Sequence, residues 1–170
     1  MKREDGFTLV EVLGVLALIA VLLGVAGAAL RGYWIAQNLE KARDELVTEM
    51  RNAQQRSMSE SHPVVFGIRL KPGSANWGIV RYDPREPAGT QCKSVGDLTF
   101  SGLVRVKEVT GFDSSGAADI ACSQVYPSYR FAFFFARGSS VAGDVTLRSL
   151  ANDNTKEIGV SGITGRVTSE

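Results

Sequence analysis

One uncharged stretch near the N-terminus constrains this chain more than any other feature of its sequence. Residues Val12 to Leu30 carry no charged side chain and are rich in Leu, Val, Ala and Ile. As a helix, a run of this length can cross a hydrocarbon core roughly 30 Å thick. Lys2 and Arg3 precede the run, and basic residues are retained on the cytoplasmic side of a membrane. We therefore expect one membrane span, with the short leader inside and the C-terminal part of the chain outside.

The residues in front of this run form a distinctive block. It is Gly6-Phe7-Thr8-Leu9-Val10-Glu11, and no small-residue cleavage site follows the apolar run as it would in an ordinary secretory signal. Glu11 is just inside the apolar segment, where an ionisable group is expensive and therefore usually functional. The block resembles the class III signal of type IV pilins and type II secretion pseudopilins.

This resemblance implies specific processing and a specific role for the carboxylate. Prepilin peptidase would cut between Gly6 and Phe7, and Phe7 would become the N-methylated first residue of the mature protein. Glu11 would act in filament assembly by pairing with the α-amino group of a neighbouring subunit, because a carboxylate is costly in lipid and a complementary amine offsets that cost. The alternative is a simple signal anchor in which the glutamate occurs by chance.

The apolar run continues into a second helical segment. There is no proline from Arg31 to Ser61, and apolar residues recur every three or four positions, which indicates one buried stripe on a helix. Pro63 then stops the helix, which we expect to end near Ser59. The expected organisation is a prepilin leader (1–6), a transmembrane half-helix (7–30), an amphipathic half-helix (31–61) and an extracytoplasmic β domain (62–170). A coiled-coil stalk is the alternative for the amphipathic half.

After Pro63, short β-like runs alternate with turn residues. The expected strands are Val64–Leu70, Trp77–Tyr82, Leu98–Val109 with a possible break at Gly102, Tyr129–Ala136, Val145–Leu150, Thr155–Ser161 and Ile163–Thr168. Two expected loops, Arg85–Asp97 and Thr110–Gln124, each hold a cysteine. The pattern predicts an α+β fold in which one long N-terminal helix packs on a C-terminal antiparallel β-sheet. The phenylalanines of Tyr129–Ala136 are expected to pack the sheet on the helix.

The last third of the chain carries a second resemblance. Four segments follow one another at hairpin spacing: Phe135-Ala136-Arg137-Gly138, Val145-Thr146-Leu147, Ile158-Gly159-Val160-Ser161 and Thr164-Gly165-Arg166-Val167. This ending resembles that of the GspH/FimT family of minor pilins and pseudopilins, and it implies a structural subunit of a type IV pilus or of a type II secretion pseudopilus. Gly138 and Gly165 are expected at turns or bulges.

The two cysteines, Cys92 and Cys122, are far apart and do not form a CxxC motif. In an exported domain, the economical interpretation is one disulfide. It would close a loop of about 30 residues and contribute on the order of 3 to 4 kcal/mol. Free buried thiols are the alternative.

The sequence contains no pattern that predicts catalysis. The single histidine, His62, and two separated cysteines fall short of a zinc site. Asp113, Asp119 and the turn Asn152-Asp153-Asn154 are the candidates for calcium binding. That turn lacks the regular acidic spacing of a calcium loop, so a hairpin turn is favoured there. We therefore expect a protein that is not an enzyme and holds no cofactor or metal.

The resemblance also implies partners and a location. The partners would be prepilin peptidase, other pilin or pseudopilin subunits, an inner-membrane assembly platform, and membrane lipid before assembly. The protein would cross the inner membrane once and become part of an extracytoplasmic pilus or pseudopilus. Whether it serves a pilus or a secretion system stays open.

DNA binding in a competence pilus is the alternative function, because some FimT-like minor pilins bind DNA through basic residues near the C-terminus. The candidates for DNA contact here are Arg148, Lys156 and Arg166. The net charge of +1 gives no general attraction to nucleic acid, and the terminal Glu170 opposes phosphate contacts. We therefore expect a structural subunit rather than a DNA receptor.

Overall fold

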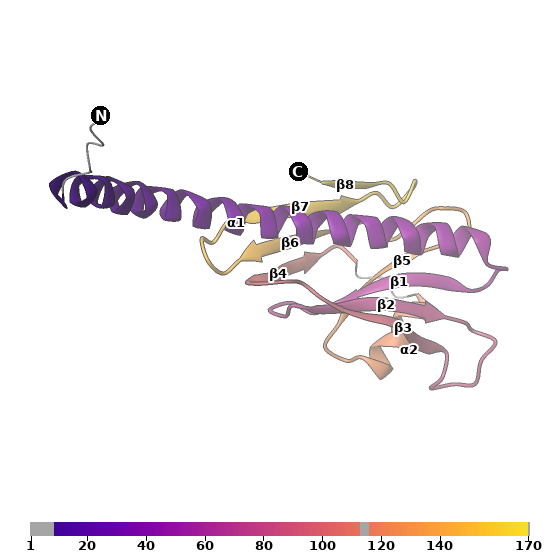
Figure 1. Cartoon of the computed structure of the whole chain (residues 1–170). Coiled ribbons are helices and arrows are strands. Elements are labelled where there is room, and N and C mark those ends of the chain that lie inside the picture. The colour runs from indigo at the N-terminus through magenta and orange to yellow at the C-terminus, as the bar shows by residue number, and fades with distance from the viewer. Residues whose placement is uncertain (1–8, 113–115, 170) are drawn as a thin grey trace, which may run out of the picture. The chain divides into compact units, whose positions relative to one another are not determined.

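The computed structural model describes residues 9–112 and 116–169. The chain divides into two compact units, Met1–Ala36 and Gln37–Glu170. Helix α1 (Leu9–Ser59) contributes to both units (Figure 1). Its residues 9–36 are the described part of the first unit, and residues 37–59 belong to the second. Each unit is described separately below.

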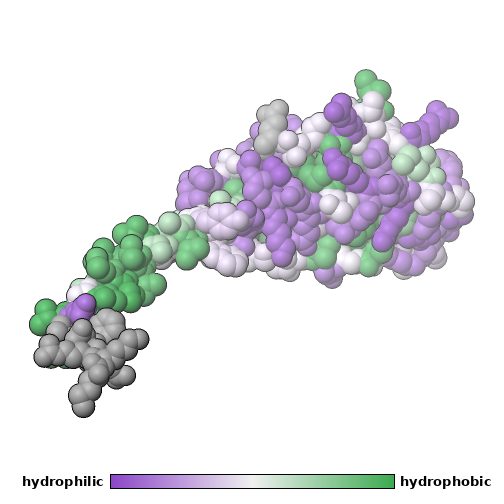
Figure 2. Space-filling model, turned by 45° about the horizontal axis from the view of Figure 1, so that its top comes forward, coloured by the Kyte–Doolittle hydropathy of each residue, from purple (hydrophilic) through white to green (hydrophobic). Residues whose placement is uncertain are grey.

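The first unit is an apolar helix whose side chains face outward. Every described side chain from Leu9 to Trp34 is exposed. The most apolar stretch has a mean hydropathy of 2.7, so α1 is long and apolar enough to cross a membrane. Figure 2 shows the continuous apolar surface over this part of α1. In water such a surface is costly, and the sequence of this segment therefore suits a lipid or protein environment.

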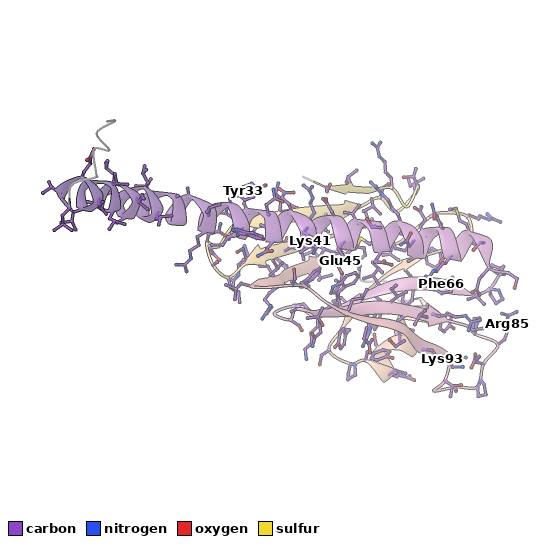
Figure 3. All side chains as sticks on the ribbon, viewed as in Figure 1. Tyr33, Lys41, Glu45, Phe66, Arg85 and Lys93 are labelled. Carbon is purple, nitrogen blue, oxygen red and sulfur yellow. A yellow bond between two sulfur atoms is a disulfide. The ribbon has the colours of Figure 1, made fainter. Side chains whose placement is uncertain are left out.

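In the second unit, α1 is an ordinary amphipathic core helix. Its buried apolar residues recur at helical spacing, and they are Leu39, Ala42, Leu46, Val47, Met50 and Ala53. The helix ends at Ser59, as the sequence predicts, and the peptide bond between His62 and Pro63 is cis. Just before that end, the buried Ser57 hydroxyl accepts a hydrogen bond of 2.8 Å from the backbone N–H of Phe66. This bond ties the last turns of α1 to the first strand, where Figure 3 labels Phe66.

The strands form two four-stranded antiparallel sheets rather than one (Figure 1). Sheet A has the order β3-β2-β1-β5 and consists of β3 (Cys92–Thr99), β2 (Asn76–Tyr82), β1 (Val65–Leu70) and β5 (Arg130–Phe134). Sheet B has the order β4-β6-β7-β8 and consists of β4 (Val104–Thr110), β6 (Gly143–Ser149), β7 (Thr155–Val160) and β8 (Val167–Ser169). The expected α+β fold is confirmed, although the single expected sheet is replaced by two.

The middle of the chain differs most from the sequence prediction. The run Leu98–Val109 was expected to be one strand, but β3 ends at Thr99 and β4 begins at Val104 in the other sheet. Gly102 lies between them with a φ of +69°, a left-handed conformation that glycine adopts readily. The chain therefore changes sheets at this turn.

Both predicted loops contain regular structure. Strand β3 begins at Cys92, inside the expected loop Arg85–Asp97, and it is an edge strand whose residues are mostly exposed and polar. Such a strand shows no apolar alternation in its sequence. Helix α2 (Ala117–Val125) lies in the other expected loop, and only Ala118 and Cys122 of its residues are buried. At the C-terminus, β8 covers Val167–Ser169 only, instead of Ile163–Thr168, because residues 162–164 form a turn.

Two apolar cores lie on the two faces of sheet A. The inner core joins α1 to both sheets, and the outer core lies under α2. Alternate residues of β5 point to opposite faces, so Phe134 belongs to the inner core while Phe131 and Phe133 belong to the outer core. The prediction that the phenylalanines of Tyr129–Ala136 pack the sheet on the helix is therefore right for Phe134. It is wrong for Phe131 and Phe133, which face the outer core, and for Phe135, which is exposed.

Candidate functional site

Of the residues predicted to act in processing and assembly, only Glu11 lies within the described residues. Gly6 and Phe7 lie outside them. Glu11 is exposed in the first turn of the described helix. Its neighbours Val12, Val15 and Leu16 line a shallow depression of about 300 Å³ with it. A carboxylate is thus placed on an otherwise aliphatic helical surface.

Two aromatic residues at the far end of the apolar run add to this unit. Tyr33 and Trp34 follow Arg31, and their side chains are 61% and 64% exposed. Figure 3 labels Tyr33 on α1. Aromatic rings beside a cation at the end of an apolar helix are typical of the membrane–water interface. This pair was not predicted, although its position directly after the uncharged run is a sufficient signal in the sequence.

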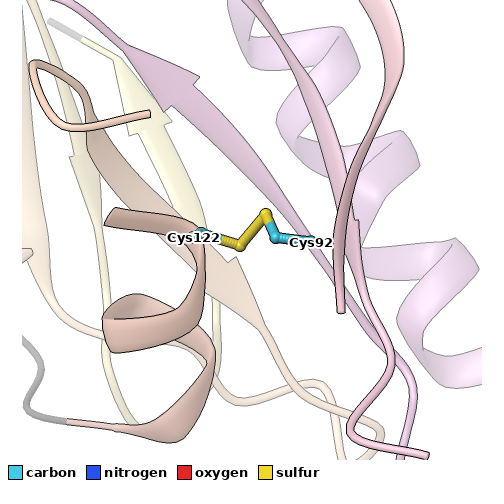
Figure 4. Close-up of a disulfide and its surroundings, with 2 residues drawn as sticks. All are labelled: Cys92 and Cys122. Carbon is cyan, nitrogen blue, oxygen red and sulfur yellow. A yellow bond between two sulfur atoms is a disulfide. The ribbon is translucent and has the colours of Figure 1, made fainter. Parts of the chain in front are cut away.

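The two cysteines form a disulfide in the outer core (Figure 4). It joins the first residue of β3 to α2, and the two Cα atoms are 5.1 Å apart. Both cysteines are buried beside Val80, Phe131 and Phe133. Because only Ala118 and Cys122 of α2 are buried, the covalent bond supplies much of the attachment of this short helix.

A buried arginine provides a second attachment for α2 and the residues after it. The guanidinium of Arg69 lies 4.5 Å from the ring centre of Tyr126 and 5.0 Å from that of Tyr129, as in cation–π contacts. It also donates a hydrogen bond to Asp97 on β3. A hydrogen bond from the Ser94 hydroxyl and the charge of Arg69 together hold the pKa of Asp97 below its usual range. The contacts of Arg69 and Asp97 therefore stabilise the packing of this region on sheet A.

A charged cluster closes the turn between β2 and β3. The backbone N–H of Arg85 donates to Asp83 at 3.1 Å, its Nε donates at 2.9 Å, and Arg81 donates at 3.0 Å. The hydrogen bonds from Arg85 hold the pKa of the Asp83 carboxyl well below its usual range. Lys93 pairs with Glu86 at the same turn, and Figure 3 labels Arg85 and Lys93 there. All five charged side chains are matched by partners, so the cluster fixes the turn rather than offering a reactive group.

The two glycines of the C-terminal motif meet on α1. Gly138 and Gly165 have φ angles of +80° and +60°. The Gln54 side-chain amide donates to the carbonyl of Gly138 at 2.7 Å and to that of Thr164 at 3.2 Å. A Cβ atom on Gly165 would lie 2.1 Å from the Gly138 oxygen. Both positions are turns, as expected, and the Gln54 contact that joins them was not predicted.

The three candidate DNA contacts are in different surroundings. Arg148 pairs with Asp153 at 3.4 Å, and Lys156 pairs with Glu40 at 3.0 Å. Arg166 lines a groove beside α1 instead. Phosphate binding needs several available cations on one face. Two of these three are already paired with carboxylates.

The candidate metal ligands do not form a site among the described residues. Asp113 lies outside them, Asp119 is in the first turn of α2, and Asp153 is in the turn before β7. No group of three or more His, Cys, Asp or Glu side chains that could hold a metal occurs in residues 9–112 and 116–169.

Comparisons with known proteins give one sequence match and two structural ones. Residues 1–27 match the prokaryotic N-terminal methylation motif. The fold is similar to that of the minor pseudopilin EpsH from the Type 2 Secretion System of Vibrio cholerae, with a TM-score of 0.55 and 7% identity over 78% of this chain and 96% of that one. The fold is also similar to the solution structure of E. coli GspH, with a TM-score of 0.54 and 11% identity over 79% of this chain and 88% of that one. No curated protein matches. At these identities, the structural matches establish the fold.

Proposed function

We propose that this chain, a GspH-like protein of the type IV pilin and pseudopilin class, is a structural subunit of an extracytoplasmic pilus or pseudopilus. The proposal rests on one observation: two independent features, a sequence motif and a fold, occur in the same chain. The N-terminal methylation motif covers residues 1–27, and the GspH-like fold covers about four-fifths of the chain. Neither feature depends on the other.

The proposed assembly pathway of the subunit has two stages. Before assembly, the apolar half of α1 spans the inner membrane, with the leader inside and the β domain outside. Prepilin peptidase removes the leader between Gly6 and Phe7, and Phe7 is N-methylated. In assembly, the helix leaves the lipid and packs among the helices of other pilin or pseudopilin subunits, driven by an inner-membrane platform. The exposed apolar surface of residues 9–34 supports both stages, because it needs an apolar environment in each.

Glu11 is the proposed assembly residue. Its carboxylate is on an aliphatic helical surface, where a charge is expensive in lipid. The α-amino group of a neighbour's Phe7 is a complementary charge, so pairing favours one register between adjacent helices. This role rests on the position of Glu11 in the motif and on that surface.

The polar clusters of the β domain support a role without catalysis. Asp83 accepts a hydrogen bond from Arg85, and Arg69 donates one to Asp97, so the charged groups of each cluster are bonded to partners within it. The two solved structures are of pseudopilins, which supports a structural subunit. The comparisons give no support to DNA binding, and Arg148 and Lys156 are paired with carboxylates. We therefore do not propose a DNA receptor.

The first experiment measures the intact mass and N-terminal sequence of the protein from cells with and without prepilin peptidase. We expect a product that begins at N-methyl-Phe7 only where the peptidase is present. Replacing Gly6 by leucine should block the cut, whereas the conservative change Thr8→Ser should not. An uncleaved chain in both strains would refute the proposal.

A second experiment tests Glu11 separately. The variant Glu11→Gln should still be cleaved but should be strongly depleted from sheared filaments or from cross-linked complexes with other subunits. Glu49→Gln removes a carboxylate from the second unit and is the matched control. Equal incorporation of the two variants would contradict the assembly role of Glu11 while leaving the class of the protein intact.

A further inference from the structure

A groove of about 560 Å³ lies between α1 and β8, within the second unit. Arg51, Gln55 and Met58 line it from α1, and Arg166, Thr168 and Ser169 line it from the C-terminal segment. We propose that this α1–β8 groove binds an extended, acidic segment of another protein, which adds to β8 as a further strand. The proposal goes beyond the filament role and does not depend on leader cleavage.

The free edge of β8 faces the groove. Strand β8 is the last strand of sheet B and, among residues 9–112 and 116–169, pairs only with β7. The backbone N–H of Ser161 donates to the carbonyl of Arg166 at 3.0 Å, so the peptide groups of Arg166 point toward β7. Peptide groups alternate along a strand, and those of Val167 and Ser169 therefore point away from β7.

The position of Arg51 agrees with this orientation. Its Nη2 atom lies 3.5 Å from the carbonyl oxygen of Val167, which places the outward edge of β8 toward α1. That contact is long for a hydrogen bond, so an incoming backbone N–H can replace it at little cost. An open strand edge beside a groove is the arrangement in which a peptide adds a strand through main-chain hydrogen bonds.

The charges of the groove indicate which peptide fits. Arg51 is on one wall and Arg166 on the other, and neither forms an ion pair with any described residue. Many cations elsewhere in the domain do, including Arg43, Arg81 and Lys156. Guanidinium groups bind carboxylates through paired, charge-assisted hydrogen bonds. Acidic side chains of an added strand would therefore meet one arginine on each side.

The floor of the groove is fixed before any ligand arrives. Gln54 lines the groove, and its amide is held by the carbonyls of Gly138 and Thr164. Met58, which is half exposed, packs close to Gly138 and adds an apolar contact. A segment with two adjacent acidic residues flanked by apolar ones suits these walls, because adjacent side chains of a strand point in opposite directions, one toward each arginine.

The test uses the full chain in detergent micelles and a fluorescent hexapeptide with two adjacent glutamates flanked on each side by two valines. The matched probe has lysine in place of both glutamates, and a short DNA duplex is the third probe. We expect the acidic peptide to bind and the lysine peptide not to bind. Arg51→Gln and Arg166→Gln should each weaken binding about tenfold, as loss of a charge-assisted hydrogen bond does. Arg148→Gln, outside the groove, should change affinity less than about twofold.

Strand addition has its own test. Ser169→Pro removes an outward N–H without removing a bond to β7, and proline is tolerated on an edge strand. It should weaken binding of the acidic peptide, whereas Ser169→Ala should not, and both variants should keep the thermal unfolding midpoint of the parent chain. Three results would overturn the proposal: Arg148→Gln weakening binding as much as the groove variants, Ser169→Pro leaving it unchanged, or tighter binding of the duplex than of the acidic peptide.

Discussion

The two parts of α1 form one continuous helix but have opposite relations to their surroundings. Leu22 in the first unit is 67% exposed, whereas Leu46 in the second is fully buried. The residue type and the secondary structure are the same in both places. The difference is that residues 37–59 find two sheets to pack on, while residues 9–34 expose their side chains. Their apolar surface is suited to partners of other kinds, namely the lipid and the other subunits proposed above.

The largest expected effect comes from removing the same side chain in both parts. Leu46→Ala should lower the free energy of unfolding of the β domain by about 4 kcal/mol, because it leaves a cavity in a packed core. Leu22→Ala should change it by less than about 0.5 kcal/mol. Thermal and denaturant unfolding of the full chain in detergent measures both. Similar losses in the two variants would mean that the first unit also packs on the domain.

Breaking the disulfide tests how much of the second unit depends on its outer core. Replacing Cys92 and Cys122 together by alanine should cost about 3.5 kcal/mol, because the bond closes a loop with a sequence separation of 30. The loss should appear as earlier hydrogen exchange in α2, while residues 39–53 of α1 keep their protection until global unfolding. Uniform loss of protection throughout α1 would show that the two cores are one cooperative structure.

The glycine turns that close on Gln54 should be more sensitive than an open turn. Gly165→Ala combines a left-handed backbone with a clash against Gly138 and should cost about 3 kcal/mol. Gly73→Ala has a similar φ of +79° with no atom within 4 Å and should cost about 1 kcal/mol. Denaturant midpoints compare the two variants directly. Equal costs would mean that the contact between the turns contributes little.

The charged turn after β2 predicts a dependence on pH that the first unit should not share. The pKa of Asp83 is lower in the folded chain than the unfolded value of about 4, because Arg85 hydrogen-bonds its charged form. Asp83 therefore stabilises the fold above about pH 4, and the contribution is lost as the pH falls below that value. Asp83→Asn should lower the unfolding midpoint at pH 7, and the gap from the parent chain should shrink in acid. A gap that is constant with pH would contradict this.

The smallest effect is spectroscopic and concerns the two tryptophans. Trp34 is 64% exposed and Trp77 is buried, so only Trp34 should respond to surrounding lipid. In liposomes, lipids brominated near the headgroup should quench the emission more than lipids brominated at the chain end, because Trp34 is expected at the interface. Trp34→Phe should remove this difference. Stronger quenching by deep bromines would place the end of the span farther along the chain.

The sequence predicted the elements whose residues face an apolar environment. Helix α1 and strands β1, β2, β5, β6 and β7 all show apolar periodicity, and each was found near its predicted position. The elements that were missed lack this signal. Strand β3 is exposed and polar along most of its length, and α2 buries only Ala118 and Cys122. Their formation depends on pairing with β2 and on the disulfide, which are long-range contacts that local sequence does not encode.

The candidate functional residues also differ in whether the local sequence reveals them. A motif at contiguous positions, such as the block that ends in Glu11, can be recognised from local sequence alone. The α1–β8 groove could not, because Arg51 and Arg166 are brought together by folding. The turn glycines were recognised as turns, but their contact through Gln54 depends on the packing of two hairpin ends on a helix.

The Cys92–Cys122 bond would also report whether the domain has reached the extracytoplasmic compartment proposed for it. Cytosolic thiols are kept reduced, whereas the envelope of a bacterium outside the inner membrane is oxidising. Both sulfur atoms belong to buried residues of the folded domain, so the bond persists after it forms. Under the topology proposed above, the fraction of chains that resist thiol alkylation without prior reduction therefore reports how much of the protein has been translocated, independently of the proposed leader cleavage.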